Sequence, residues 1–156
     1  MRSALALLLL LAACAPAPAP SLRDPSATLA SKADLDPAAL GGRWHEVARI
    51  GPGCAGGVVD YASRPGGGLL LREACGGRVA TGRAEPVGPG RLRVLRAGSA
   101  TEEWVLWMDT DARTAVIARA DGAGARVLDR TPVSSPDRLR AAETVLEFNG
   151  FRPARR

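Results

Sequence analysis

Eight short stretches rich in β-branched and large apolar residues follow one another from residue 42 onward, and clusters of glycine and proline separate them. This pattern is typical of an antiparallel all-β fold, because connections such as 64–68 and 121–124 are short enough to join sequential strands as hairpins. Eight such strands favour closure into an up-and-down barrel, since closure removes the exposed sheet edges. The expected strands are residues 43–50, 58–63, 69–74, 78–85, 91–96, 102–109, 114–119 and 126–131.

One helix is predicted near the C-terminus. Ser135 suits the N-cap, Pro136 suits the first helical position, and Gly150 ends the pattern. We expect this helix to pack a single apolar stripe on the outside of the barrel. The stripe consists of Leu139, Ala142, Val145 and Leu146.

Four motifs in this order resemble those of the lipocalin family. Residues 42–49 (GRWHEVAR) resemble the first-strand motif Gly-x-Trp-Tyr-Glu-(Ile/Val)-Ala-Arg, and residues 82–84 resemble the Gly-Lys-Ala of the fourth strand. Residues 109–117 occupy the place of the turn between the sixth and seventh strands, and residues 128–132 resemble the Arg-Thr-Pro that ends the eighth. The resemblance covers residues 35–151 and is strongest with the bacterial membrane-anchored lipocalins of the kind called Blc.

The sequence departs from the lipocalin pattern at two positions, because His45 and Ala112 stand where the family has tyrosine. The resemblance implies that Trp44 and Arg130 stack and plug one end of the barrel. Physically, an indole near the start of the first strand meets a guanidinium at the end of the eighth only if the sheet closes. Taken singly, Trp44 could be an ordinary core residue and Arg130 a solvated arginine.

The inward-facing residues decide what the barrel can hold. On the eighth strand, alternation places Arg126, Leu128 and Arg130 on one face, with Leu128 in mid-cavity and Arg126 nearer the mouth. The resemblance adds Leu92, Val94, Val105, Trp107 and Val116 to this lining. An apolar lining with one cation suits a small amphiphile such as a fatty acid or lysophospholipid, whose anionic head would pair with Arg126. The alternative is a barrel filled by side chains, and a structural or interaction role.

The N-terminus predicts export. Residues 1–13 carry Arg2 and then an apolar run too short to span a bilayer, which is typical of a signal peptide. Residues 11–14 (LAAC) resemble the lipobox of bacterial lipoproteins, in which Cys14 is acylated and becomes the mature N-terminus. The alternative is an ordinary secretory signal with an incidental cysteine.

The domain boundaries follow from this interpretation. We expect a lipidated cysteine and proline-rich tether over residues 14–33, and the barrel domain over residues 34–156. Ala15 in place of aspartate favours the outer membrane of a Gram-negative cell, with the domain facing the periplasm. The remaining cysteines, Cys54 and Cys75, favour a disulfide in an oxidising compartment, with a pair of buried free thiols as the alternative.

Other functional classes are disfavoured. Residues 51–56 match the Gly-x-Gly-x-x-Gly dinucleotide fingerprint, but no helix is expected to follow them. The Gly-x-Ser-x-Gly motif of a serine nucleophile does not occur, and the single histidine disfavours a metal site. The acidic pairs Glu102–Glu103 and Asp109–Asp111 are interpreted as solvated hairpin ends and not as an acid/base dyad. A formal net charge of +5 is spread along the chain, and six aromatic residues offer little for base stacking. We therefore expect neither enzymatic activity, nor a cofactor, nor nucleic-acid binding.

Overall fold

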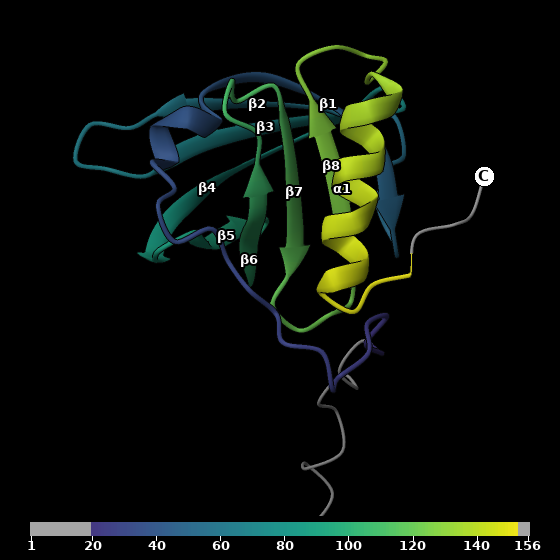
Figure 1. Ribbon diagram of the computed structural model, residues 1–156. Helices are drawn as coiled ribbons and strands as arrows, with labels where there is room; N and C mark the ends of the chain where they lie inside the picture. Colours follow the sequence, from purple (N-terminus) through teal and green to yellow (C-terminus); the bar gives the residue numbers. More distant parts are fainter. Residues whose placement is uncertain (1–19, 153–156) are drawn as a thin grey trace, which may run out of the picture.

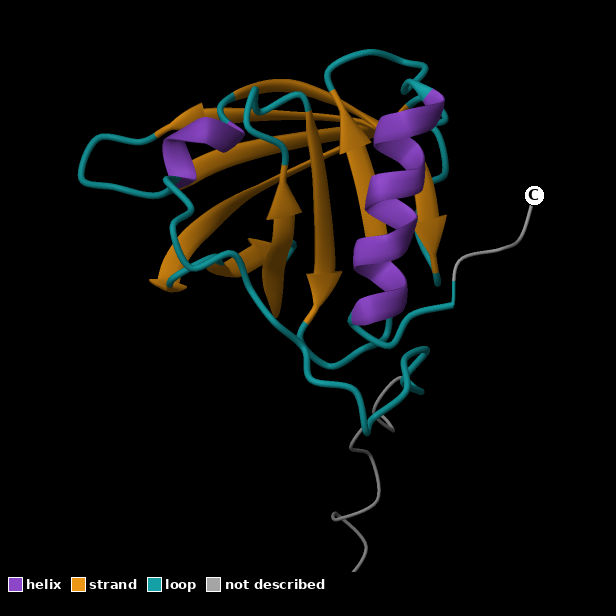
Figure 2. Cartoon of the chain, viewed as in Figure 1, coloured by secondary structure: helices purple, strands orange, loops and turns teal. Residues whose placement is uncertain are grey.

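The computed structural model describes residues 20–152, and its strands form one closed antiparallel barrel in which each strand pairs with its sequence neighbours. Pairing of the first strand with the last completes the circle (Figures 1 and 2). The predicted fold class is thus confirmed. The elements are η1 Pro37–Leu40, β1 Gly42–Ile50, β2 Val58–Ser63, β3 Leu69–Cys75, β4 Arg78–Gly88, β5 Arg91–Arg96, β6 Ser99–Met108, β7 Thr114–Arg119, β8 Ala125–Asp129 and α1 Pro136–Phe148.

Helix α1 lies on the outside of the barrel, against β6, β7 and β8 (Figure 1). It begins as predicted, because the Ser135 hydroxyl accepts a hydrogen bond from the Arg138 N–H and Pro136 occupies the first turn. Its residues Ala142 and Leu146 are buried in an outer apolar cluster. The barrel therefore has two cores, one inside the sheet and one between the sheet and the helix.

β6 begins three residues earlier than the sequence predicted. The connection from β5 is a tight turn in which Ala97 and Gly98 both adopt positive φ angles of 46° and 81°. Such primed turns match the twist of the paired strands, so the ladder continues to the turn itself. β8 is shorter than predicted and ends at Asp129, whose carboxylate accepts a hydrogen bond from the Thr131 N–H.

One end of the barrel is closed, and we call it the closed end. The Arg130 guanidinium lies 3.6 Å from the centroid of the Trp44 ring and donates to the carbonyl oxygens of Ala39, Arg43 and Ala112. The Trp44 indole N–H donates to the Leu40 carbonyl at the end of η1. The first and last strands are therefore joined at the closed end by side chains as well as by the ladder.

Residues 20–33, which the sequence assigned to the tether, lie against the barrel. The Leu22 N–H donates to the Gly122 carbonyl, and the Lys32 N–H donates to the Val105 carbonyl. Arg23 forms an isolated bridge with Phe151, just beyond α1. This part of the predicted tether belongs to the folded domain, whereas the predicted signal peptide, the lipidation site Cys14 and residues 15–19 lie outside the described residues.

Candidate functional site: a half-filled barrel with a charged floor

The closed half of the barrel interior is filled. Four of the predicted lining residues, Leu92, Val94, Val105 and Leu128, are at most 2% exposed and pack in the interior cluster with Trp44. None of these four lines the cavity described below. The space that the sequence assigned to a ligand at mid-barrel is occupied by side chains.

The opposite half is open and contains a cavity of about 590 Å³. Its opening, which we call the mouth, is surrounded by the β1–β2 loop and the β3–β4, β5–β6 and β7–β8 turns. Small apolar side chains, including Val59, Ala80 and Ile117, contribute to its walls. The predicted disulfide between Cys54 and Cys75 is present and also lines the cavity, where it ties the β1–β2 loop to the end of β3.

The floor of the cavity is a closed ring of two arginines and two glutamates, which we call the charged ring. The Arg96 guanidinium pairs with both oxygens of Glu73, at 2.8 and 2.9 Å, and with Glu103 at 2.8 Å. Arg126 donates to Glu73 at 2.8 Å, to Glu103 at 2.9 Å and to the Tyr61 hydroxyl at 3.1 Å. These side chains come from β2, β3, β5, β6 and β8, so only a closed barrel brings them together.

The charged ring corrects the predicted role of Arg126. Arg126 does line the cavity, but its charge is already compensated by Glu73 and Glu103. The lining as a whole contains five arginines and three glutamates, in place of the single cation that the sequence predicted. The interpretation of Glu103 as a solvated hairpin end was wrong, because this residue is 8% exposed and faces the interior.

The electrostatics of the ring favour its charged form. Burial raises the pKa of Glu73, but hydrogen bonding to Arg96 and the charges of Arg126 and Arg96 outweigh it and lower the pKa to about 2. Burial likewise opposes ionisation of Glu103, and the same two arginines lower its pKa. Burial raises the pKa of Tyr61 to about 12, so the Tyr61 hydroxyl stays protonated at neutral pH.

Unused hydrogen-bond donors remain at this floor. Each guanidinium of the ring has five N–H donors, of which Arg96 and Arg126 use three apiece. The Thr101 hydroxyl, which lines the cavity, is buried and has no hydrogen-bond partner within residues 20–152. A ligand group that supplies acceptor oxygens would therefore complement the floor.

Three further arginines line the cavity outside the charged ring. Arg49 pairs with Glu46 at 2.5 and 2.6 Å, and Arg119 pairs with Asp121 at 2.5 and 3.0 Å. Arg78, in the first position of β4, is exposed and forms no ion pair within the described part of the chain. The one uncompensated cation of the cavity is therefore at the mouth.

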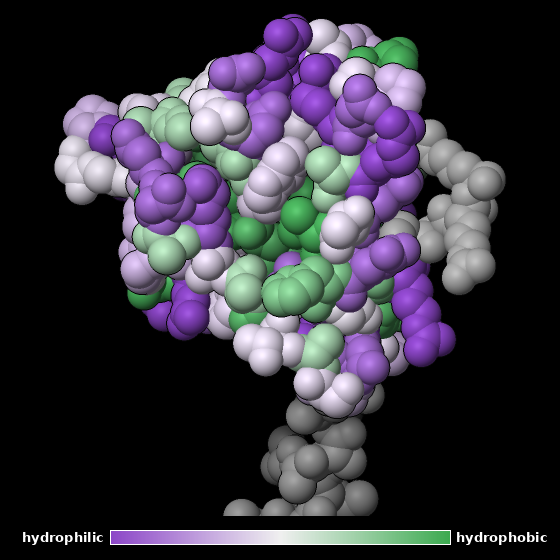
Figure 3. Space-filling view, in the orientation of Figure 1, coloured by the Kyte–Doolittle hydropathy of each residue, from purple (hydrophilic) through white to green (hydrophobic). Residues whose placement is uncertain are grey.

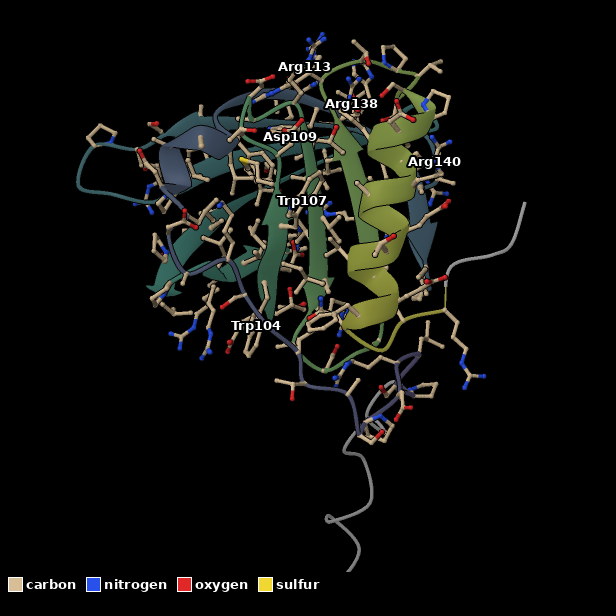
Figure 4. The ribbon with its side chains drawn as sticks, in the orientation of Figure 1. Trp104, Trp107, Asp109, Arg113, Arg138 and Arg140 are labelled. Atoms are coloured by element: carbon tan, nitrogen blue, oxygen red, sulfur yellow. A yellow bond between two sulfur atoms is a disulfide. The ribbon has the colours of Figure 1, made fainter. Side chains whose placement is uncertain are left out.

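Trp107 and Val116 do not line the interior, which corrects the prediction. A β-bulge in β6 shifts the register between Val105 and Trp107, so that Leu106 and Trp107 both point outward and Met108 returns to the interior. Val116 pairs with Trp107 and joins the same outer cluster. Figure 4 shows Trp107 on the outer side of β6 and β7, and Figure 3 shows apolar residues gathered there beside α1.

At the floor of the cavity, sequence reasoning missed four residues, Tyr61, Glu73, Arg96 and Thr101, although a signal for two of them was present. Glu73 continues the inward positions of Leu69 and Leu71 on β3, and Arg96 continues those of Leu92 and Val94 on β5. A charge that falls in phase with a buried apolar run is a candidate interior group. For Thr101 the sequence offered no comparable signal.

The described residues contain no group of three His, Cys, Asp or Glu side chains that could hold a metal ion. Between residues 20 and 152, no helix combines the length and apolar character required to cross a membrane.

Comparison with known proteins identifies the fold. No family model and no curated protein matches the sequence. Among solved structures, the cockroach allergen Per a 4 is similar over 80% of this chain and 87% of its own, with a TM-score of 0.60 and 14% identity. For lobster apocrustacyanin A1, the similarity covers 75% of this chain and 79% of that protein, with a TM-score of 0.57 and 13% identity. For the siderocalin Ex-FABP, it covers 76% of this chain and 96% of that protein, with a TM-score of 0.57 and 16% identity. These neighbours are lipocalins, and the chain has the lipocalin fold.

Proposed function

We propose that this protein is a lipid-anchored lipocalin that binds a small single-chain amphiphile, of the fatty-acid or lysophospholipid type, for transport or storage at the cell envelope. The observation that carries the proposal is the open half of the barrel. Its volume of about 590 Å³ lies within the range of small-molecule sites, and several polar groups converge on its floor. A wholly filled barrel, which would favour a structural role, lacks such a space.

The chemistry of the cavity favours a ligand that enters with its polar group first. The floor offers unused N–H and O–H donors, and the apolar side chains of Val59, Ala80 and Ile117 line the cavity beside the charged ring. Acceptor oxygens of a carboxylate or ester would satisfy the donors, and the hydrocarbon chain would follow the walls outward. Arg78, the one lining arginine without an ion pair among the described residues, also favours an anionic ligand over a cationic one.

The test is titration with a fluorescent fatty acid and with a fluorescent lysophospholipid. Ala80→Trp should place an indole inside the cavity and strongly weaken uptake, because Ala80 shares the inward phase of the fully buried Ala84 on β4. The matched control is Ala62→Trp, which places the same side chain on the exposed outer face of β2 and should leave uptake unchanged. Equal uptake by both variants, with folded circular dichroism spectra, would refute binding in this cavity.

A second variant tests the orientation of the ligand. Thr101→Val removes the unpartnered hydroxyl while keeping the shape of the side chain. Affinity for the fatty acid should fall several-fold if its carboxylate reaches the floor, and should stay the same or rise if the hydrocarbon end enters first.

Anchoring forms the other half of the proposal and rests on the lipobox at residues 11–14. Acylation of Cys14 and retention in the outer membrane, with the barrel in the periplasm, should be visible as the mass of a diacylglyceryl group on the protein expressed in a Gram-negative host. Cys14→Ser should remove that mass and release the protein from the membrane fraction.

A further inference from the structure

We propose that the mouth of the barrel faces the lipid bilayer and that its rim docks on the membrane surface, so that an amphiphile passes directly between the bilayer and the cavity. This inference rests on the proposed acylation of Cys14. It goes beyond anchoring, because acylation of Cys14 does not by itself state which face of the domain meets the bilayer.

The path of the chain brings its N-terminal side to the mouth. Leu22 donates its N–H to Gly122 of the β7–β8 turn at 2.8 Å and packs on Gly51 of the β1–β2 loop, where an added Cβ would lie 2.8 Å from the Leu22 side chain. The first described residues therefore lie between two of the connections that surround the mouth (Figure 1). Only five residues separate Cys14 from Pro20.

The short spacer limits where the domain can sit. The six Cα–Cα steps from Cys14 to Pro20 reach at most about 20 Å when fully extended. Strand β1 has nine residues and runs from the closed end to the mouth. With a rise of roughly 3.3 Å per residue and a strand tilt of about 40° from the barrel axis, the closed end lies a further ~20 Å from the membrane. The mouth is therefore the end that the anchor holds next to the lipid.

Exposed apolar side chains at this end suit insertion among lipid headgroups. Leu22 is 41% exposed on the rim, and Val79, next to the β3–β4 turn, is 54% exposed. Phe148 is 76% exposed at the C-terminal end of α1, which the Arg23–Phe151 bridge joins to the N-terminal segment. Partly inserted aromatic and aliphatic groups are the usual contacts of interfacial proteins.

Charge adds a second attraction at the same rim. Arg78 stands beside the mouth without an ion pair among the described residues, and a cation in this position is attracted by anionic phospholipid headgroups. A bilayer also presents its headgroups to the mouth first. The polar group of an amphiphile would therefore enter the cavity ahead of its hydrocarbon chain, and the charged ring at the floor is complementary to that group.

The experiment compares the two ends of one helix in the lipidated full-length protein. Phe148→Cys and Val133→Cys each introduce a thiol for an environment-sensitive fluorophore; Val133 precedes α1 and is 81% exposed. The remaining cysteines are held in the disulfide or acylated, so labelling is specific. Each protein is reconstituted into vesicles of phosphatidylethanolamine and phosphatidylglycerol that carry a nitroxide-labelled lipid.

We expect the fluorophore at position 148 to be quenched several times more strongly than the one at position 133. Equal quenching, or stronger quenching at position 133, would overturn the docking inference while leaving ligand binding in the cavity intact. Absence of the lipid mass on Cys14 would overturn both this inference and the proposed anchoring. Uptake of a fluorescent fatty acid by the same proteins shows whether the cavity still binds ligand. A failure of docking or of acylation is thereby distinguished from a failure of the binding site.

Discussion

Replacing Arg126 by methionine should destabilise the protein strongly, because it breaks the charged ring and leaves its carboxylates buried. Arg126 is 8% exposed and donates three hydrogen bonds, to Glu73, Glu103 and Tyr61. Removing one partner of a buried ion pair typically costs about 3–5 kcal/mol, because the remaining charge loses its compensation. Arg96 still contacts both glutamates, so we expect a loss near the lower limit, about 3 kcal/mol.

The pH dependence gives this prediction a second signature. The pKa of Glu73 in the folded protein is about 2, below its ordinary value of 4.5, so this carboxylate stabilises the wild type above pH 4.5. That contribution is lost as the pH falls from 4.5 towards 2. Without Arg126, burial raises the pKa of Glu73 and Glu103 relative to the wild type, and both accept protons at a higher pH. The difference in stability between wild type and variant should therefore narrow as the solution is acidified.

Urea denaturation followed by tryptophan fluorescence at neutral and acidic pH measures both effects. The control is Arg43→Met, which removes an arginine that is 64% exposed and paired with Asp60 at the surface, and should cost much less stability than Arg126→Met. Either of two results would refute the reasoning. One is an Arg126→Met protein as stable as the control variant at neutral pH. The other is a stability difference between wild type and Arg126→Met that stays constant down to pH 3.

Three further variants test other parts of the structure by the same denaturation assay. Joint replacement of Cys54 and Cys75 by alanine should cost about 3 kcal/mol, because the unfolded chain regains the entropy of the open loop; an unchanged midpoint would contradict a stabilising disulfide. Arg130→Met should cost about 2–4 kcal/mol through lost stacking on Trp44 and three lost hydrogen bonds, and a loss below 1 kcal/mol would argue against a closing role. Leu146→Ala should cost about 2–4 kcal/mol with unchanged fatty-acid affinity, because Leu146 belongs to the outer cluster; weakened binding would contradict that separation.

The interior face of β6 shows where the predicted lining was wrong. Simple alternation carries inward positions from Trp44 to Glu46 and from Glu103 to Val105, and then breaks at a bulge in each strand. A bulge adds one residue to the strand and reverses the phase of everything beyond it. The lipocalin resemblance had placed both Val105 and Trp107 in the lining, although the bulge puts the two residues on opposite faces.

The sequence by itself determined the number of strands, their hairpin order, the helix and the lipocalin fold. These features depend on turn residues, caps and apolar spacing, which act between near neighbours in the chain. Only the tertiary structure decided that half of the barrel is filled and that the floor of the other half is charged. Glu73, Arg96, Glu103 and Arg126 lie far apart in sequence, and their charges become mutually compensating only when closure of the sheet brings four strands around one point.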